Sequence, residues 1–424
     1  MIEDAAVRLR AWQYRVFSSL WICYAAFYFC RVNFAVAQPK ILADFPTWTS
    51  AQIGTIPSVY AACYALGQVL NGPFSQRIGA RKVMTGSLLL AAALNFGFSM
   101  TSSYALMLVL WGLNGYVQST GWSLVAATVG NWSPAGRRGT IMGLVSTCYQ
   151  VGNVAAWIMS GQLIELWGWR AAFYVPSALV VPVAALFFWG VRNEPQDVGL
   201  APLREELQDA GDGKTAAAPL TAWETMRHTL NNRILWTLGI GFFCANAVRY
   251  AFMNWAVQYL ADFHGRSVKN SAVTAVVLPL IGSLGAISAG WASDTLFDKR
   301  RAPVCAIMLA CLALVCMAFV QVPQGEWVWA TVLLAAAGYF IYGPDMLMSG
   351  AATVDFSHPR AAAAATSFTM ALGALGAIFS GWGVGALRDS AGGQWSLVFY
   401  TLAGLALVPA ALMLTLWNAK PKGK

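Results

Sequence analysis

Charged residues are scarce in this sequence. Only 11% of its 424 residues are Asp, Glu, Lys or Arg, whereas 58% are hydrophobic and the mean hydropathy is +0.56. A soluble globular protein carries roughly 25% charged residues, so this chain could not cover a water-facing surface. The shortage of charge excludes a soluble protein and predicts a membrane protein.

Motifs of several other protein classes are also missing. The sequence has no GxxxxGK loop for nucleotide phosphates, no CxxC pair and no histidine at metal-ligand spacing. Most of the eight cysteines lie in apolar runs, where we interpret them as packing residues. The alternation typical of a membrane β-barrel is absent. We therefore expect no enzyme activity, no metal and no cofactor. The basic residues are spread over loop ends, so we expect no nucleic-acid partner either.

Long apolar runs recur along the chain instead. Runs of about 20 residues can cross the roughly 30 Å hydrocarbon core as helices, and helices satisfy their own backbone groups there. We predict an all-α membrane protein with twelve spans, at 16–38, 51–75, 83–100, 104–130, 139–165, 171–192, 234–261, 271–296, 302–322, 327–356, 360–388 and 394–418. The polar stretch 193–233 divides them, so we predict two six-helix halves, 1–192 and 234–424, joined by a linker.

Basic residues are concentrated in loops on one side of these predicted spans. They include clusters near Arg81, Arg137 and Arg300, together with both ends of the chain and the linker. Positively charged loops remain in the cytoplasm. We therefore expect both termini and the linker to be cytoplasmic, which agrees with an even number of spans.

Two arginines lie deep in apolar runs, and they occupy matching places in an internal repeat. The interval from Arg31 to Arg249 equals the interval from GPFSQ (Gly72–Gln76) to GWASD (Gly290–Asp294). An arginine inside a membrane is a functional-site hypothesis by default. Two guanidinium forks facing one cavity would form an anion site suited to phosphate. The alternative is that each arginine reaches the membrane surface or makes a structural pair.

Polar and aromatic residues accompany both arginines. Tyr24, Tyr28 and Arg31 are spaced i, i+4, i+7, which would place them on one helix face. Asn246 would share a face with Arg249. Trp122 is a further candidate for lining the cavity, although packing in the helix bundle is an equally good interpretation.

Four collinear segments resemble the organophosphate:phosphate antiporter family of the major facilitator superfamily. They read YAAFYFCRVNFAVAQPKIL, NEPQDVGL, VRYAFMNWAVQYL and IYGPDMLMSGAA, and they span both halves in the family's order. The resemblance implies two parallel six-helix repeats related by a pseudo-two-fold axis, with substrate near the membrane midplane. It also implies phosphate binding by Arg31 and Arg249, cavity lining by Tyr24, Tyr28 and Tyr342, and gating by the loops that contain Arg77 and Asp294.

The chain departs from this family at four positions. Gln68 stands where glycerol-phosphate and glucose-phosphate members carry Lys, and Tyr149 stands where the glycerol-3-phosphate type has His. Gln76 replaces the Asp of the gating loop, which weakens one expected ion pair. Asp345 stands where relatives carry an uncharged residue. We therefore predict a substrate site that includes Gln68 and Tyr149 and has gained an anion.

Asp345 has three possible roles on sequence grounds, because an isolated carboxylate at membrane depth needs a partner or a proton. It could form a structural or gating ion pair with Arg249 or Arg31. It could hold a cationic part of the substrate, such as an amine on a phosphate or phosphonate. It could couple transport to protons. The sequence leaves all three open.

The functional expectation is a secondary transporter in a bacterial inner membrane. It would move a small phosphorylated or phosphonate anion inward, exchanging it for inorganic phosphate by alternating access. Its partners would be this anion, phosphate and the lipid bilayer, and we expect a monomer. One alternative is a membrane-bound sugar-phosphate sensor that signals to a kinase. Another is a proton-coupled symporter of a different organic anion or zwitterion, which Asp345 and the missing Lys favour.

Overall fold

The computed structural model describes residues 2–134, 137–201, 203, 227–298, 300–357 and 362–419. Every regular element within these ranges is helical. The chain forms two compact units, which are described separately. The first contains Met1–Phe34 and Cys63–Ala217, and the second contains Ala35–Ala62 and Ala218–Lys424. Residues 35–62 thus group with the second unit, although they precede most of the first unit in the sequence. The division of the chain into halves 1–192 and 234–424 remains a prediction.

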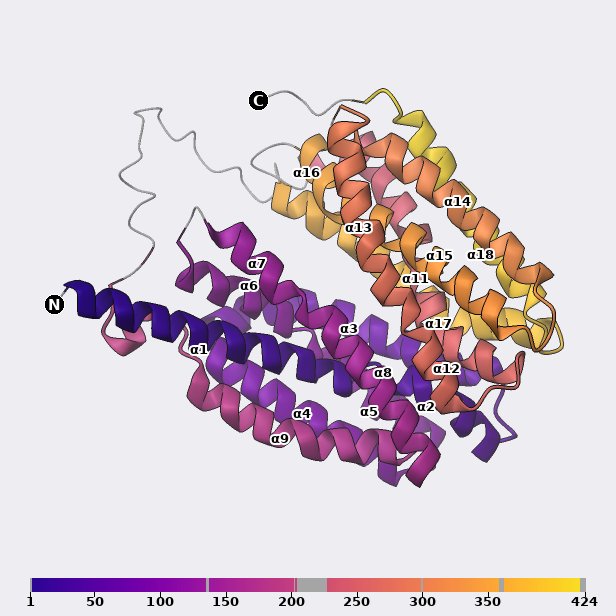
Figure 1. The fold of residues 1–424 in the computed structure, drawn as a ribbon, viewed down its shortest axis with the longest axis horizontal. Coiled ribbons are helices and arrows are strands. Elements are labelled where there is room, and N and C mark those ends of the chain that lie inside the picture. The colour runs from indigo at the N-terminus through magenta and orange to yellow at the C-terminus, as the bar shows by residue number, and fades with distance from the viewer. Residues whose placement is uncertain are drawn as a thin grey trace. The chain divides into compact units, whose positions relative to one another are not determined.

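The first unit is built around the long helix α1 (Ile2–Phe29). The other helices are α4 (Ala80–Met100), α5 (Tyr104–Gln118), α6 (Gly121–Trp132), α7 (Arg138–Ser146), α8 (Cys148–Trp167), α9 (Ala171–Gly190) and the later part of α3 (Ser50–Ile78). Helix α1 packs on α8 and α9, and α4 packs on α5 and α9 (Figure 1). Leu20, Phe27, Leu88 and Val125 are fully buried in the core between these helices.

The second unit contains α11 (Arg233–Asp262) at its centre. Around it are most of α2 (Asn33–Asp44), α12 (Val268–Ala275), α13 (Val277–Thr295), α14 (Arg301–Gln321), α15 (Trp327–Met346), the π-helical turn η4 (Leu347–Ala351), α16 (Ala352–Phe356), α17 (Ala362–Ser390) and α18 (Ser396–Thr415). Helix α11 packs on α17 and α18, while α13 packs on α15 and α14 packs on α18 (Figure 1).

The start of α3 is fixed against the end of α17 in this second unit. The Asp389 carboxylate accepts hydrogen bonds from the backbone N–H groups of Ser50 (2.9 Å) and Ala51 (2.8 Å). These are N–H groups that the first turn of a helix leaves without an internal partner, and a carboxylate there also complements the helix dipole. Gly54 and Gly381 allow the two backbones to approach, because a side chain at either position would collide with the other backbone.

The helix count agrees with the twelve-span prediction. Eleven helical stretches among the described residues are long and apolar enough to cross a membrane. The remaining span is made by the shorter helices α5 and α6, which follow one another across Ser119 and Thr120. The spans predicted at 16–38, 139–165 and 271–296 are present as the stretches Ala6–Asp44, Arg138–Trp167 and Val268–Thr295. The helix within each stretch is interrupted once, at 30–32, at Thr147 and at Val276 respectively.

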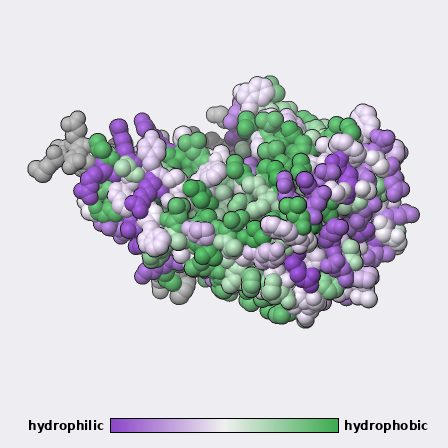
Figure 2. Space-filling model, turned by 60° about the horizontal axis from the view of Figure 1, so that its bottom comes forward, coloured by the Kyte–Doolittle hydropathy of each residue, from purple (hydrophilic) through white to green (hydrophobic). Residues whose placement is uncertain are grey.

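Large apolar side chains are exposed over much of the molecule, as the green areas of Figure 2 show. Trp189, Ile287 and Leu314 have exposed fractions of 63%, 69% and 71%. A soluble monomer rarely exposes apolar patches on this scale. The surface is therefore that of a protein whose solvent is the hydrocarbon of a bilayer.

Candidate substrate site: two arginine environments

The first arginine lies at a break between two helices. Helix α1 ends at Phe29 and α2 begins at Asn33, so Arg31 lies in a turn. Arg31 therefore lies just beyond the helix that carries Tyr24 and Tyr28, and its guanidinium still lies beside the Tyr28 ring. The break is possible because side chains replace the missing helical hydrogen bonds, as backbone groups at membrane depth require.

Three amide side chains satisfy the backbone carbonyl that the break exposes. The carbonyl oxygen of Cys30 accepts hydrogen bonds from Asn114 Nδ2 (2.7 Å), Gln118 Nε2 (2.9 Å) and Asn95 Nδ2 (3.2 Å). Asn95 also accepts a hydrogen bond from Asn33 at the start of α2 (3.0 Å). All four amide side chains are fully buried. They form a polar network that joins the two sides of the break to α4 and α5.

This network orients the guanidinium of Arg31. Gln118 donates from its amide nitrogen to Cys30 O and to Asn114 Oδ1 (2.9 Å), which leaves its amide oxygen as an acceptor. That oxygen accepts a hydrogen bond from Arg31 Nε at 3.0 Å. The Arg31 guanidinium carbon also lies 5.0 Å from the centre of the Tyr28 ring and 5.2 Å from that of Tyr64, within the range of cation–π attraction.

Four of the predicted site residues form one aromatic cluster beside Arg31. The Tyr24 ring centre lies 5.3 Å from that of Tyr149 and 5.5 Å from that of Trp122, and the Trp122 and Tyr149 centres are 4.6 Å apart. Tyr28 contacts both tyrosines at 6.2 Å. Tyr24 is only 2% exposed, so it supports the cluster from within.

The second arginine lies within an unbroken helix and faces a carboxylate. Arg249, in the middle of α11, donates from Nη1 to Asp345 Oδ1 on α15 at 2.7 Å. Their side chains are 24% and 21% exposed. Pro344 precedes Asp345, and the π-helical turn η4 follows shortly after. Such turns are frequent at functional sites because they shift the side-chain register. The ion pair proposed for Asp345 on sequence grounds is thus present with Arg249.

Two tyrosine rings flank this ion pair. The Arg249 guanidinium carbon lies 5.1 Å from the centre of the Tyr342 ring and 5.2 Å from that of Tyr250. The Tyr342 hydroxyl donates to the sulfur of Met253 at 3.6 Å. Asn246, one turn before Arg249 on α11, is 5% exposed, and its Oδ1 is a buried acceptor for which the described atoms provide no hydrogen-bond donor.

The architecture and its sequence can now be compared with known proteins. The sequence model of the Major Facilitator Superfamily matches residues 20–381, which is most of the chain. The chain belongs to the major facilitator superfamily. Members of this superfamily are transport proteins, so the protein is not an enzyme.

Relatives of full length narrow the superfamily to one family. The chain is 31% identical to a probable hexose phosphate transport protein of Chlamydia pneumoniae, over 99% of this chain and 95% of the relative. It is 29% identical to the membrane sensor protein UhpC of Escherichia coli (strain K12), over 97% and 94%. It is 27% identical to a glycerol-3-phosphate transporter of Bacillus subtilis (strain 168), over 98% and 94%. These matches agree with the resemblance of the four segments to the organophosphate:phosphate antiporter family.

Solved structures support the fold of this superfamily member. The bacterial homologue of the human lysosomal transporter Spinster has a TM-score of 0.72 and 17% identity, covering 96% of this chain and 95% of that one. The nucleoside transporter NupG also has a TM-score of 0.72, with 14% identity over 95% and 99%. At these identities the likeness concerns the fold alone.

The residues predicted to gate this transport protein are described in part. Asp294 on α13 pairs with Arg301 at the start of α14, and Arg301 also contacts Asp355 on α16 at 3.4 Å. The side chains of Gln76 and Arg77 lie outside the described residues. Gln68 is exposed on α3. The gating role of Arg77 and Asp294, and the substrate role of Gln68, remain predictions.

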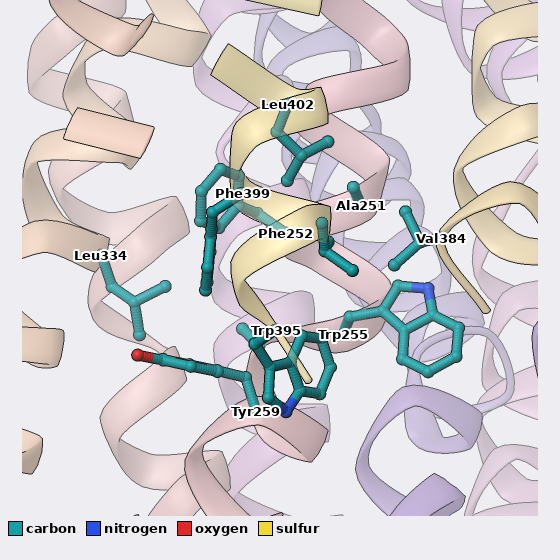
Figure 3. Close-up of a pocket in the computed structure, with 11 residues that line it drawn as sticks. Ala251, Phe252, Trp255, Tyr259, Leu334, Val384, Trp395, Phe399 and Leu402 are labelled. Carbon is teal, nitrogen blue, oxygen red and sulfur yellow. The ribbon is translucent and has the colours of Figure 1, made fainter. Parts of the chain in front are cut away.

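An apolar pocket in the second unit is not suited to an anion. Trp255, Tyr259, Trp395 and Phe399 gather around it, and its lining residues carry no charge (Figure 3). His264 lies beside it, with Nε2 at 3.1 Å from the Tyr259 hydroxyl. Burial lowers the pKa of His264, and the positive charge of Arg266 lowers it further. The pocket therefore lacks the positive charge that a phosphoryl group requires.

Proposed function

We propose that this protein is a secondary transporter of a small phosphorylated or phosphonate organic anion, which it exchanges for inorganic phosphate by alternating access. The observation that carries the proposal is the pair of arginines at membrane depth, one from each sequence repeat. Arg31 is oriented by an amide and Arg249 by a carboxylate, and aromatic rings flank both.

Guanidinium chemistry supports a phosphoryl or phosphonyl ligand. The planar fork of Arg donates paired hydrogen bonds to phosphate oxygens and stays charged at any physiological pH. Relatives named as hexose phosphate and glycerol-3-phosphate transporters support the same ligand class. In the proposal, a ligand bound by Arg31 and Arg249 together shifts the equilibrium between the two access states, because it favours the state in which both arginines reach it.

The test is exchange in proteoliposomes loaded with inorganic phosphate. We expect uptake of labelled phosphate from outside, driven by internal phosphate and inhibited by phosphate esters or phosphonates. Protein-free liposomes and liposomes without internal phosphate are the controls. A folded protein that exchanges no phosphate would contradict the proposal. Uptake that needs a pH gradient instead of internal phosphate would favour the proton-coupled symporter.

A sensor is the second candidate, because a relative named as the membrane sensor protein UhpC is similar over nearly the whole chain. A sensor and a transporter can share a ligand site. Binding of a sugar phosphate to the purified protein, measured by a shift in its unfolding temperature, together with absence of exchange in the same preparation would favour the sensor.

We further propose a monomer in a bacterial inner membrane with both termini and residues 193–233 in the cytoplasm. Most of this linker lies outside the described residues. The proposal is based on the basic loops that the sequence places on one side. A single cysteine at position 215, in a cysteine-free background, should react only with a reagent that crosses the membrane. Labelling by an impermeant reagent in intact cells would reverse the topology.

A further inference from the structure

The surroundings of Arg249 form a site for a cation, and Arg249 itself fills it. Asp345 supplies a carboxylate at 2.7 Å, and the Tyr342 and Tyr250 rings lie 5.1 and 5.2 Å from the guanidinium carbon. A carboxylate with aromatic rings on neighbouring sides is how proteins bind substituted ammonium groups. The same groups would bind a different cation if the guanidinium turned towards an anion.

A phosphoryl ligand on Arg249 must compete with Asp345. Two terminal oxygens of a phosphate and the two oxygens of a carboxylate offer the same kind of acceptor to one guanidinium fork. A ligand that takes Arg249 away leaves Asp345 without its cation, and a carboxylate stranded at membrane depth is strongly unfavourable. A ligand that brings its own cation replaces one ion pair with two.

We propose that Asp345 is a specificity-determining residue that favours phosphate or phosphonate substrates carrying a primary ammonium group. This inference rests on the proposed function, since it requires Arg249 to bind the phosphoryl group. The ammonium takes the place of the guanidinium between Asp345 and the tyrosine rings. Simple phosphate esters bind less well, because Asp345 then competes with them for Arg249.

In the same proposal, Asn246 is a further acceptor for the ammonium group. Its Oδ1 is buried without a hydrogen-bond donor among the described atoms, and Asn246 lies one helical turn from Arg249. A buried acceptor that lacks a donor is unfavourable until a ligand provides one. A primary ammonium has three N–H donors, enough for the Asp345 carboxylate and the Asn246 oxygen together.

The experiment compares two ligands that differ only in the amine, 2-aminoethyl phosphate and ethyl phosphate. Binding is measured as inhibition of labelled phosphate exchange by the wild-type protein. We expect 2-aminoethyl phosphate to bind about tenfold more tightly, which corresponds to about 1.4 kcal/mol. Asp345→Asn should remove this preference, and it should also tighten binding of ethyl phosphate because Arg249 is no longer held by a carboxylate.

Glu165→Gln is the matched control, because it removes an exposed carboxylate at the end of α8. It should keep the wild-type preference. Asn246→Leu is the second test variant. It should reduce the preference for 2-aminoethyl phosphate without tightening the binding of ethyl phosphate, because Asp345 still competes for Arg249. This variant keeps the inference testable if Asp345→Asn does not fold.

The outcomes separate the inference from the function on which it rests. Equal binding of the two ligands by the wild type would overturn the inference and leave the proposed function standing. An unchanged preference in Asp345→Asn would also overturn it, since another residue would then recognise the amine. If neither ligand nor phosphate binds to the folded wild type, the proposed function itself is wrong.

Discussion

Arg31 and Arg249 occupy matching places in the sequence repeat, yet the two halves hold them by different means. Arg31 lies in the turn between α1 and α2, and the amide oxygen of Gln118 accepts a hydrogen bond from its Nε. Arg249 lies within the continuous helix α11, and the carboxylate of Asp345 accepts a hydrogen bond from its Nη1. Residues 248–250, which correspond to the break at 30–32 in the sequence repeat, are helical.

The difference separates two ways to position a guanidinium in a membrane. An amide orients the group by a hydrogen bond but adds no charge of its own. A carboxylate orients the group and also neutralises it, so an incoming anion must compete with it. An anion that approaches Arg31 therefore meets a guanidinium that an amide orients, whereas an anion that approaches Arg249 must displace Asp345.

The largest expected effect is a loss of phosphate exchange when either arginine is replaced by lysine. Arg31→Lys and Arg249→Lys each keep the charge but lose the paired donors. Losing one charge-assisted hydrogen bond of about 1.5–3 kcal/mol should reduce phosphate exchange roughly 10- to 150-fold. Exchange is measured in proteoliposomes, with Arg170→Lys as control because Arg170 contacts Ser102 outside both arginine environments. Near-normal exchange by either variant would remove that arginine from the proposed site.

The next effect tests the amide network on the Arg31 side. Gln118→Leu removes a donor to Cys30 O and the acceptor of Arg31 Nε. It should destabilise the protein by about 1–3 kcal/mol, because buried polar groups lose their partners. Gln38→Leu is the matched control, since Gln38 is equally buried but neither of its amide atoms has a hydrogen-bond partner among the described residues.

Unfolding of the two purified variants in detergent decides this prediction. Gln38→Leu should leave the midpoint near that of the wild type, because within the described part of the chain it removes no hydrogen bond and leaves no partner unsatisfied. Equal destabilisation by both substitutions would mean that loss of the amide's volume or packing, rather than its hydrogen bonds, matters at position 118.

The smallest effect concerns an aromatic ring on the Arg31 side. Tyr28→Leu removes one ring near the Arg31 guanidinium. Loss of a cation–π attraction of about 0.5–2 kcal/mol that helps to hold the guanidinium in place predicts roughly 2- to 30-fold weaker phosphate binding. Tyr28→Phe keeps the ring and should bind within a factor of about two. A Phe variant as weak as the Leu variant would show that the hydroxyl, not the ring face, carries the interaction at position 28.

Much of this architecture could be predicted because the bilayer imposes simple rules. The apolar runs indicate the spans, and an arginine stands out within any of them. Tyr24, Tyr149 and Trp122 were each named as candidates on separate grounds, and the structure brings their rings together. Their part in a substrate site remains a prediction. The pairing of Arg249 with Asp345 was one of the alternatives that the sequence left open.

The features that the sequence did not reveal depend on contacts between distant segments. The break at 30–32 contains Arg31, but no helix-ending residue marks it, and the three amides that satisfy the exposed carbonyl of Cys30 lie on other helices. The contact by which Gln118 orients Arg31 therefore could not be predicted from a local pattern. Tyr250 was missed because helical periodicity places adjacent residues on different faces, whereas a long guanidinium reaches its neighbour's ring. The Asp389 cap on α3 links residues too far apart for any local pattern.

The carbonyl of Cys30 also has a consequence for how the protein is made. The first span leaves the ribosome before α4 and α5, so its exposed carbonyl, Asn33 and Arg31 enter the membrane ahead of the amides that later satisfy them. Until Asn95 and Asn114 have entered the membrane, this span is unusually polar for a transmembrane segment. We therefore expect the broken conformation of this span to form late in biogenesis, when the helices that carry its hydrogen-bond partners have followed it into the bilayer.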